Sequence, residues 1–207
     1  MKTRFKCRIF DLDGTLYPRK SPLFAEIRKR TNEWLGKELG VTEEEAIRRL
    51  YVLKPQYPDY LDRFLKVGLS VKGYHEGVFA EISPANFLGP DMELRAILES
   101  LDGPNFVVSY APLKYAELVL KVLGIRELIR QVHSIDEENH FKGRKYAEIT
   151  AIESILPSEG IVFGDNFTVD LKPALELGMS AVIIGEEDQM VKLARFIDIR
   201  EALKAID

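Results

Sequence analysis

The sequence predicts an α/β fold in which a parallel sheet carries one all-helical insert directly after its first strand. Short apolar runs alternate with amphipathic helical patterns over most of the 207 residues, and this alternation is typical of strand–helix–strand units. The alternation stops between Leu16 and Gly89, where only helical patterns occur. Hydrophobic residues make up 46% of the chain, which is enough to bury a core of this kind.

Five apolar runs are predicted to form the strands of the sheet. They span residues 5–10, 105–109, 132–135, 160–163 and 180–184, and the third has the weakest pattern. In open α/β sheets ligands bind beyond the carboxyl ends of the strands. We therefore expect the polar residues that follow these runs to share one crevice.

The segment between the first two strands is predicted to fold into four helices. A Ser-Pro pair at Ser21 predicts the start of a helix that ends at Gly40, and Thr42 opens a second helix with an acidic capping box. Two further helices are predicted over residues 59–67 and 71–82. Together these helices would form a cap over the crevice.

The remaining helical patterns lie after the insert and are predicted to cover the sheet. They span residues 91–101, 112–123, 145–156 and 169–177. The prediction is thus a three-layer, Rossmann-like core made of residues 1–15 and 90–207, with residues 16–89 as the helical cap.

Two acidic residues, Asp11 and Asp13, follow the first strand and are themselves followed by Gly14 and Thr15. Two carboxylates so close together form an oxygen-rich site that can hold a hard divalent cation and offer a nucleophile. The alternative is a strand that ends in an Asx-type turn, where Asp and Gly occur for local reasons.

Three later positions repeat the arrangement of a polar residue at a strand end. Ser109 ends one strand shortly before a helix start, which is a good place to bind an anion. Asp165 and Asp170 follow another strand and could complete a carboxylate site for Mg²⁺. Residues 140–145 are rich in cations, and one buried lysine there could offset the charge of the carboxylates. Each position alone also fits a common cap or a solvated loop.

Taken in order, these motifs resemble those of the haloacid dehalogenase superfamily of aspartate-nucleophile phosphatases. The Asp11-x-Asp13-Gly14-Thr15 segment resembles the first motif, Ser109 the second, and Gly164-Asp165 with Asp170 the fourth. A lysine of the 142–145 loop would be the third, and the spacing to Asp165 favours Lys142 over Lys145.

The continuation Leu16-Tyr17-Pro18 and the helical insert resemble the pyrimidine 5′-nucleotidase-like branch with its first-position cap. The chain departs from the superfamily at two places. Tyr110 stands where an Asn often follows the second motif, and neither Lys142 nor Lys145 precedes a proline.

The resemblance implies a role for each motif residue. Asp11 would be the nucleophile, Asp13 the general acid and base, and Lys142 a catalytic cation. Asp11, the Asp13 main chain and Asp165 would bind Mg²⁺. The phosphoryl group would contact Thr15, Ser109, Tyr110 and Asp170.

The implied function is Mg²⁺-dependent hydrolysis of a small phosphorylated metabolite through an aspartyl-phosphate, with a nucleoside monophosphate as the first substrate to consider. A sugar phosphate or phosphoglycolate is the alternative substrate. A haloacid dehalogenase and a non-catalytic phosphate-binding relative are the alternative functions. Asp13 favours phosphate esters, because dehalogenases of the superfamily lack an acid at this position. Cap residues Tyr17, Tyr57, Tyr60, Tyr74 and His75 are candidates for substrate contact.

Composition limits the partners. The formal net charge of −4 argues against a nucleic-acid polymer, and no apolar segment reaches the length of a membrane span. The single cysteine, Cys7, lies in the first apolar run, is predicted to be a core residue, and suits a reducing compartment. We expect a cytoplasmic protein that is a monomer or a small homo-oligomer.

Overall fold

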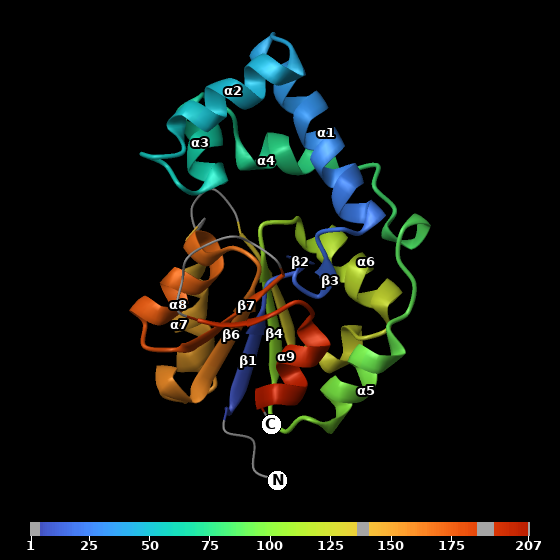
Figure 1. Ribbon diagram of the computed structural model, residues 1–207, viewed down its shortest axis with the longest axis vertical. Helices are drawn as coiled ribbons and strands as arrows, with labels where there is room; N and C mark the ends of the chain where they lie inside the picture. The colour runs from blue at the N-terminus through green and yellow to red at the C-terminus, as the bar shows by residue number, and fades with distance from the viewer. Residues whose placement is uncertain (1–4, 136–140, 186–192, 207) are drawn as a thin grey trace.

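Six parallel strands form the centre of the computed structural model, which describes residues 5–135, 141–185 and 193–206 (Figure 1). Their order in the sheet is β5-β4-β1-β6-β7-β8. Their bounds are Cys7–Phe10 (β1), Asn105–Ser109 (β4), Gln131–Ser134 (β5), Gly160–Gly164 (β6), Ser180–Ile184 (β7) and Ala194–Phe196 (β8). The chain runs from β1 outward to one side and then returns to build the other side. The strand order therefore reverses next to β1, where α/β sheets open a crevice.

All five predicted strands are present, and the predicted α/β class with a parallel sheet is confirmed. The sixth strand, β8, was not predicted. It has three residues at the edge of the sheet, and the side chains of Ala194 and Arg195 are exposed. An exposed edge strand needs no apolar run, so the pattern does not mark it.

The strand β1 is buried along its whole length. Phe10 stacks on Phe163 of β6, with ring centroids 5.1 Å apart. Arg8 is buried too, but its Nε donates to Asn105 Oδ1 at 2.7 Å, so the charge is hydrogen-bonded. Cys7 is fully buried, as predicted, and burial raises the pKa of its thiol to about 12.

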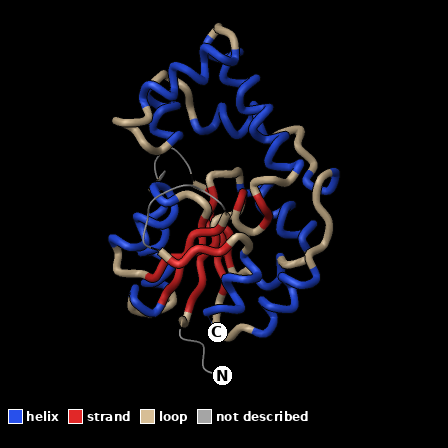
Figure 2. Tube along the Cα trace, in the orientation of Figure 1, coloured by secondary structure: helices blue, strands red, loops and turns tan. Residues whose placement is uncertain are grey.

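Helices cover both faces of the sheet (Figures 1 and 2). One side carries α5 (Met92–Ser100), α6 (Leu113–Leu123) and α9 (Ile199–Ile206), and the other carries α7 (Lys142–Ile152) and α8 (Lys172–Glu176). A π-helical turn, Phe167–Leu171, precedes α8. Two differences from the prediction stand out. Helix α9 was not predicted. Helix α7 begins at Lys142 rather than at residue 145; the earlier start was not predicted because Phe141, the residue before it, has no side chain that caps a helix.

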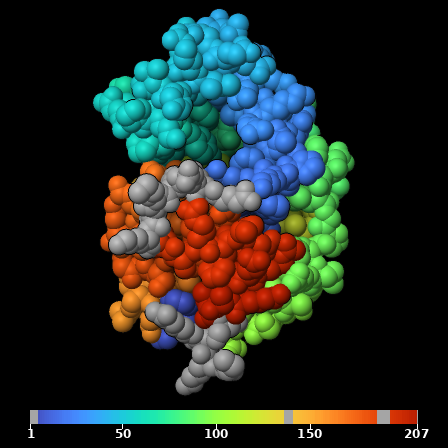
Figure 3. Space-filling model, viewed as in Figure 1, coloured from blue at the N-terminus to red at the C-terminus, as the bar shows by residue number. Residues whose placement is uncertain are grey.

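A unit of four helices lies beyond the carboxyl ends of the strands and forms a lobe above the sheet (Figure 3). It contains α1 (Pro22–Leu39), α2 (Glu43–Leu53), α3 (Tyr60–Lys66) and α4 (Val71–Tyr74), which continues into a π-helical turn at His75–Phe79. As predicted, Ser21 caps α1 and Gly40 ends it in a left-handed conformation. The connection back to the core contains a 3-10 turn at Pro84–Asn86.

The predicted capping box at Thr42 is only half formed. Thr42 Oγ1 accepts from Glu45 N at 3.3 Å, but the Glu45 carboxylate pairs with Arg48 and Arg49. Those ion pairs use the carboxylate that would otherwise complete the box.

The expectation of helices alone between Leu16 and Gly89 is wrong at one point. Tyr17–Pro18 (β3) pairs with Asp13–Gly14 (β2) in a separate two-stranded sheet. Two-residue strands leave no periodic pattern, so only the structure shows this pair. It places Tyr17 beside Asp13. Among the described residues, no helix combines the length and apolar character needed to cross a bilayer.

Candidate active site

Asp11 lies at the carboxyl end of β1, and three hydrogen bonds hold it in position. Its N–H donates to Phe163 O at 2.9 Å. Thr15 Oγ1 donates to Asp11 Oδ2 at 3.0 Å, and Lys142 Nζ donates to Asp11 Oδ1 at 2.7 Å. The side chain is thus held by a hydroxyl and an ammonium group within a nearly closed environment.

Lys142 is the lysine that reaches the carboxylates. Its side chain is 1% exposed and donates a second hydrogen bond to Asp170 Oδ1, also at 2.7 Å. Burial lowers the pKa of Lys142, but Asp11 and Asp170 raise it more, so the net pKa lies well above its usual value. Lys145 instead pairs with Glu148. His140 of the same cation-rich loop lies outside the described residues.

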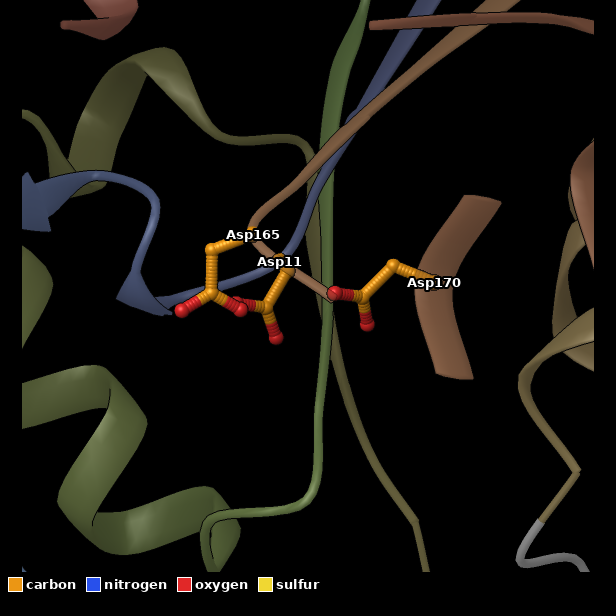
Figure 4. Close-up of side chains that lie close together, drawn as sticks. All are labelled: Asp11, Asp165 and Asp170. Atoms are coloured by element: carbon orange, nitrogen blue, oxygen red, sulfur yellow. The ribbon is translucent and has the colours of Figure 1, made fainter. Parts of the chain in front are cut away.

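The carboxylates of Asp11, Asp165 and Asp170 converge (Figure 4), each offering an oxygen within 4.8 Å of the others. Burial, together with Asp11 and Asp170, raises the pKa of Asp165, against the opposing effect of its ion pair with Arg19. Burial also raises the pKa of Asp170, although Lys142 lowers it. Burial is the main cause of both shifts, and repulsion from the neighbouring carboxylates adds to it.

This donor set fits a hard divalent cation. Mg²⁺ prefers carboxylate oxygens, and its charge would offset the repulsion among these carboxylates. Glycine at position 14 allows the Asp165 carboxylate to lie close to the main chain there, since a Cβ on residue 14 would lie 2.0 Å from Asp165 Oδ2. The Asp13 carboxylate is not part of this cluster, so Asp13, a predicted ligand, could contribute only its main-chain carbonyl.

Asp13 has a different environment from Asp11. Its Oδ1 accepts a hydrogen bond from Tyr17 OH, which lies 3.4 Å from Tyr115 OH. Burial raises the pKa of Asp13 to about 7, with a contribution from Asp11 and against the effect of Tyr17. Tyr115 was not predicted to lie in the site, and Tyr17 was predicted there as a substrate contact rather than as a partner of Asp13. Their link to Asp13 depends on the β2–β3 pair and on helix α6.

Ser109 and Tyr110 follow β4. Ser109 is 1% exposed, and its Oγ accepts from Ala111 N at 3.0 Å. Tyr110 connects the core to the helical unit, because its OH donates to Asp59 and its carbonyl oxygen lies 2.8 Å from His75 Nε2. Both residues, predicted to contact substrate, line the same cavity as the carboxylates.

That cavity has a volume of about 440 Å³ and extends from the carboxylates to the helices α1, α2 and α3. Of the aromatic residues expected to contact substrate, Tyr60 and Tyr74 line it. Tyr57 instead lies against the ammonium group of Lys66. The cavity wall also includes three arginines that were not predicted to lie in the site, Arg19, Arg28 and Arg63.

Comparison with known proteins supports the fold. No family model matches the chain. Phosphate metabolism protein 8 of Saccharomyces cerevisiae is 27% identical over 212 residues, a region that covers 88% of this chain and 62% of that protein. The chain therefore spans less than two thirds of this relative.

Solved structures match over nearly the whole chain. A HAD phosphatase from Thermococcus onnurineus has a TM-score of 0.58 and 23% identity, and the match covers 100% of this chain and 98% of that one. A haloacid dehalogenase-like hydrolase, SP0104, from Streptococcus pneumoniae has a TM-score of 0.70 and 19% identity, with 99% of each chain covered. A 2-haloacid dehalogenase from Pseudomonas syringae has a TM-score of 0.56 and 17% identity, covering 98% of this chain and 97% of that one.

The fold is that of the haloacid dehalogenase superfamily, and the predicted resemblance is confirmed at this level. Phosphatases and dehalogenases both have this fold. The choice between these activities therefore depends on the residues of the site.

Proposed function

We propose that the chain is a Mg²⁺-dependent phosphomonoesterase that works through an aspartyl-phosphate on Asp11. The observation that carries the proposal is the contrast between two neighbouring carboxylates. Asp11 faces the ammonium group of Lys142, whereas Asp13 is held by Tyr17 and has a pKa raised to about 7 by burial. A pair of acids in such different environments suits a nucleophile and a proton donor at neutral pH.

In the first step an oxygen of Asp11 attacks phosphorus and the bond between phosphorus and the ester oxygen breaks. Asp13 gives its proton to the departing oxygen. In the second step Asp13 takes a proton from water, and this water attacks phosphorus. Inorganic phosphate leaves, and Asp11 and the protonated Asp13 are restored.

The other site residues would offset the charge of the phosphoryl group and hold it in position. Lys142 bridges Asp11 and Asp170, so its ammonium group can offset charge on the phosphoryl group. Ser109 would donate its hydroxyl hydrogen bond to a phosphoryl oxygen, while Thr15 donates its own to Asp11 Oδ2 and so orients the nucleophile. Bound by Asp11, Asp165 and the Asp13 carbonyl, Mg²⁺ would reduce the repulsion between an anionic nucleophile and an anionic substrate.

The helical unit, which we take as a cap of residues 16–89, supplies the wall that meets the leaving group. This wall is mainly apolar and aromatic, with Phe24, Ile27, Leu35, Leu50 and Phe64 among its residues. Such a surface supports a leaving group with a ring, such as a nucleoside, over a sugar or glycolate. A nucleoside monophosphate is therefore our first substrate, with a sugar phosphate or phosphoglycolate as the alternative.

The test compares the wild type with Asp11→Asn, and with Asp102→Asn as an exposed control. Release of phosphate from nucleoside monophosphates and release of halide from a 2-haloacid are measured with Mg²⁺ and with EDTA. We expect Mg²⁺-dependent phosphate release, lowered at least about a thousandfold by Asp11→Asn and unchanged by Asp102→Asn. Circular dichroism checks that the fold is retained.

Full Mg²⁺-dependent turnover by Asp11→Asn would overturn the assignment. Release of halide without phosphate would indicate a dehalogenase. Release of neither from the wild type, across a set of phosphorylated metabolites, would indicate a non-catalytic relative.

A further inference from the structure

Two buried tyrosines, Tyr17 and Tyr115, lie beside the carboxylate of Asp13, and each side chain is 3% exposed. Tyr17 belongs to β3, whose pairing with β2 places it opposite Asp13, and its OH donates to Asp13 Oδ1. The OH of Tyr115, on α6, lies 3.4 Å from the OH of Tyr17. The two phenols and the carboxylate therefore form one buried chain of hydrogen bonds.

The direction of these hydrogen bonds follows from the number of protons. A phenol has one O–H, and Tyr17 uses it for Asp13. Tyr115 must therefore donate to the oxygen of Tyr17 rather than accept from it. At 3.4 Å this hydrogen bond is long, so we expect it to contribute less than the hydrogen bond from Tyr17 to Asp13.

The positions of both rings are fixed by different parts of the fold. Tyr17 is held by the small β2–β3 sheet next to the first motif. Tyr115 packs edge-on against Phe79, with ring centroids 4.8 Å apart. Phe79 lies in the π-helical turn of the helical unit and lines the cavity. The hydroxyl groups thus have defined positions from which they can orient a neighbouring carboxylate.

The Asp13 carboxylate is the group that this chain orients, and it lines the cavity in which the leaving group would lie. The terminal torsion of an aspartate is broad, so a free carboxyl group rotates easily. The hydrogen bond from Tyr17 to Oδ1 restricts that rotation. An oxygen that already accepts a hydrogen bond is also the poorer place for a proton, which leaves Oδ2 to carry the proton that the acid transfers.

We propose that Tyr17 is a positioning residue for the general acid, holding the Asp13 carboxyl group so that its Oδ2 proton meets the ester oxygen, and that Tyr115 supports Tyr17. This inference rests on the proposed phosphatase function and adds two residues to it. Both tyrosines act through Asp13, so their effect should appear only where the leaving group needs a proton.

The test uses benzyl, phenyl and p-nitrophenyl phosphate, whose leaving groups have similar rings and need a proton to a decreasing degree. Values of kcat/KM are measured with Mg²⁺ for the wild type, Tyr17→Phe, Tyr115→Phe and Tyr57→Phe. Phenylalanine keeps each ring and removes the hydroxyl. Tyr57 is the matched control, because it lies against Lys66 and is not among the described residues that line the cavity.

The value of kcat/KM reports the steps up to departure of the leaving group, so the later role of Asp13 as a base does not enter. We expect Tyr17→Phe to lower it by about tenfold or more for benzyl phosphate and by less than about twofold for p-nitrophenyl phosphate. Tyr115→Phe should lower the value for benzyl phosphate by about two- to threefold. Tyr57→Phe should change none of the three.

A double mutant shows whether Tyr17 acts through Asp13. With phenyl phosphate, Asp13→Asn and the combined Asp13→Asn/Tyr17→Phe variant should agree within about twofold, because the acid that Tyr17 positions is already absent. Losses that multiply would mean that Tyr17 acts independently of Asp13 and would overturn the proposal. The ratio of kcat/KM for two esters, measured on one preparation, does not depend on how much of that preparation is folded.

Other outcomes separate this inference from the proposed function. An equal loss for all three esters, or no loss for any, in Tyr17→Phe would overturn its role as a positioning residue. Unchanged values for Tyr115→Phe would overturn its supporting role. If Asp13→Asn lowers kcat/KM equally for all three esters, or the wild type hydrolyses none of them, the proposed function fails and the inference falls with it.

Discussion

Replacing Lys142 with methionine should destabilise the metal-free protein by an amount that depends on pH. Lys142 is 1% exposed and lies 2.7 Å from carboxylate oxygens of both Asp11 and Asp170, which are buried as well. Removing one partner of a buried ion pair leaves charge uncompensated and costs about 3–5 kcal/mol. With an m-value of about 2 kcal/mol/M, the urea midpoint at pH 8 should fall by about 1.5–2.5 M.

The loss should be smaller at pH 5.5, because the carboxylates can then take up protons. Burial already raises the pKa of Asp170 while Lys142 lowers it, so removal of the lysine raises this pKa further. A protonated carboxyl needs no counter-charge, and each unit of pKa shift corresponds to about 1.4 kcal/mol. We therefore expect a loss of only about 1–2 kcal/mol at pH 5.5.

The assay is urea unfolding in EDTA at both pH values, with Lys145→Met as the matched control. Lys145 is 20% exposed and pairs with Glu148, which is 41% exposed, so its loss should cost less than about 1 kcal/mol at either pH. Equal losses for the two variants, or a loss for Lys142→Met that does not change with pH, would refute the reasoning.

Three further predictions concern the carboxylates. Asp13→Asn should slow hydrolysis of alkyl phosphates far more than that of p-nitrophenyl phosphate, whose leaving group needs no proton; equal losses would contradict the role as acid. Without metal, burial raises the pKa of Asp165 to about 8, so the folded state binds more protons than the unfolded chain. The free energy of unfolding should then fall between about pH 5 and 8 relative to Asp165→Asn, and saturating Mg²⁺ should abolish this difference. Urea unfolding in parallel series with EDTA and with Mg²⁺ measures it; a difference between the two proteins that does not change with pH in EDTA would contradict the raised pKa. Arg19→Ala should bind Mg²⁺ severalfold more tightly in calorimetry, because Asp165 no longer has to leave its ion pair with Arg19; unchanged or weaker binding would disprove that competition.

Much of the core follows from local pattern. Apolar runs predicted every strand of the six-stranded sheet except β8, and Ser21 and Gly40 marked the ends of α1 correctly. The pattern failed where elements are short or exposed, as at β2, β3 and β8, because two or three residues show no period. The start of α7 was missed for a related reason, since no polar side chain caps it.

In the candidate site, too, local pattern predicted some of the residues but not all of their contacts. The order of polar residues after the strands predicted that Asp11, Ser109, Asp165 and Asp170 would share one edge of the sheet, and all four line one cavity. Tyr17 and Arg19 follow the first motif closely in sequence, yet their partners could not be predicted. The contact of Tyr17 with Asp13 needs the small β2–β3 sheet.

The sequence by itself determined five strands of the main sheet and, to within one residue, where they end. It therefore also determined which acidic and hydroxyl side chains meet at the crevice. Periodicity and strand ends are local properties of the sequence. In a parallel sheet the carboxyl ends of the strands lie at the same edge, so the side chains that follow them lie close together. Only the tertiary structure decided which partners these side chains have. Lys142 meets Asp11 across 131 residues, and Arg19 meets Asp165 across 146. Such contacts depend on how helices pack over the sheet, and no local pattern encodes that packing.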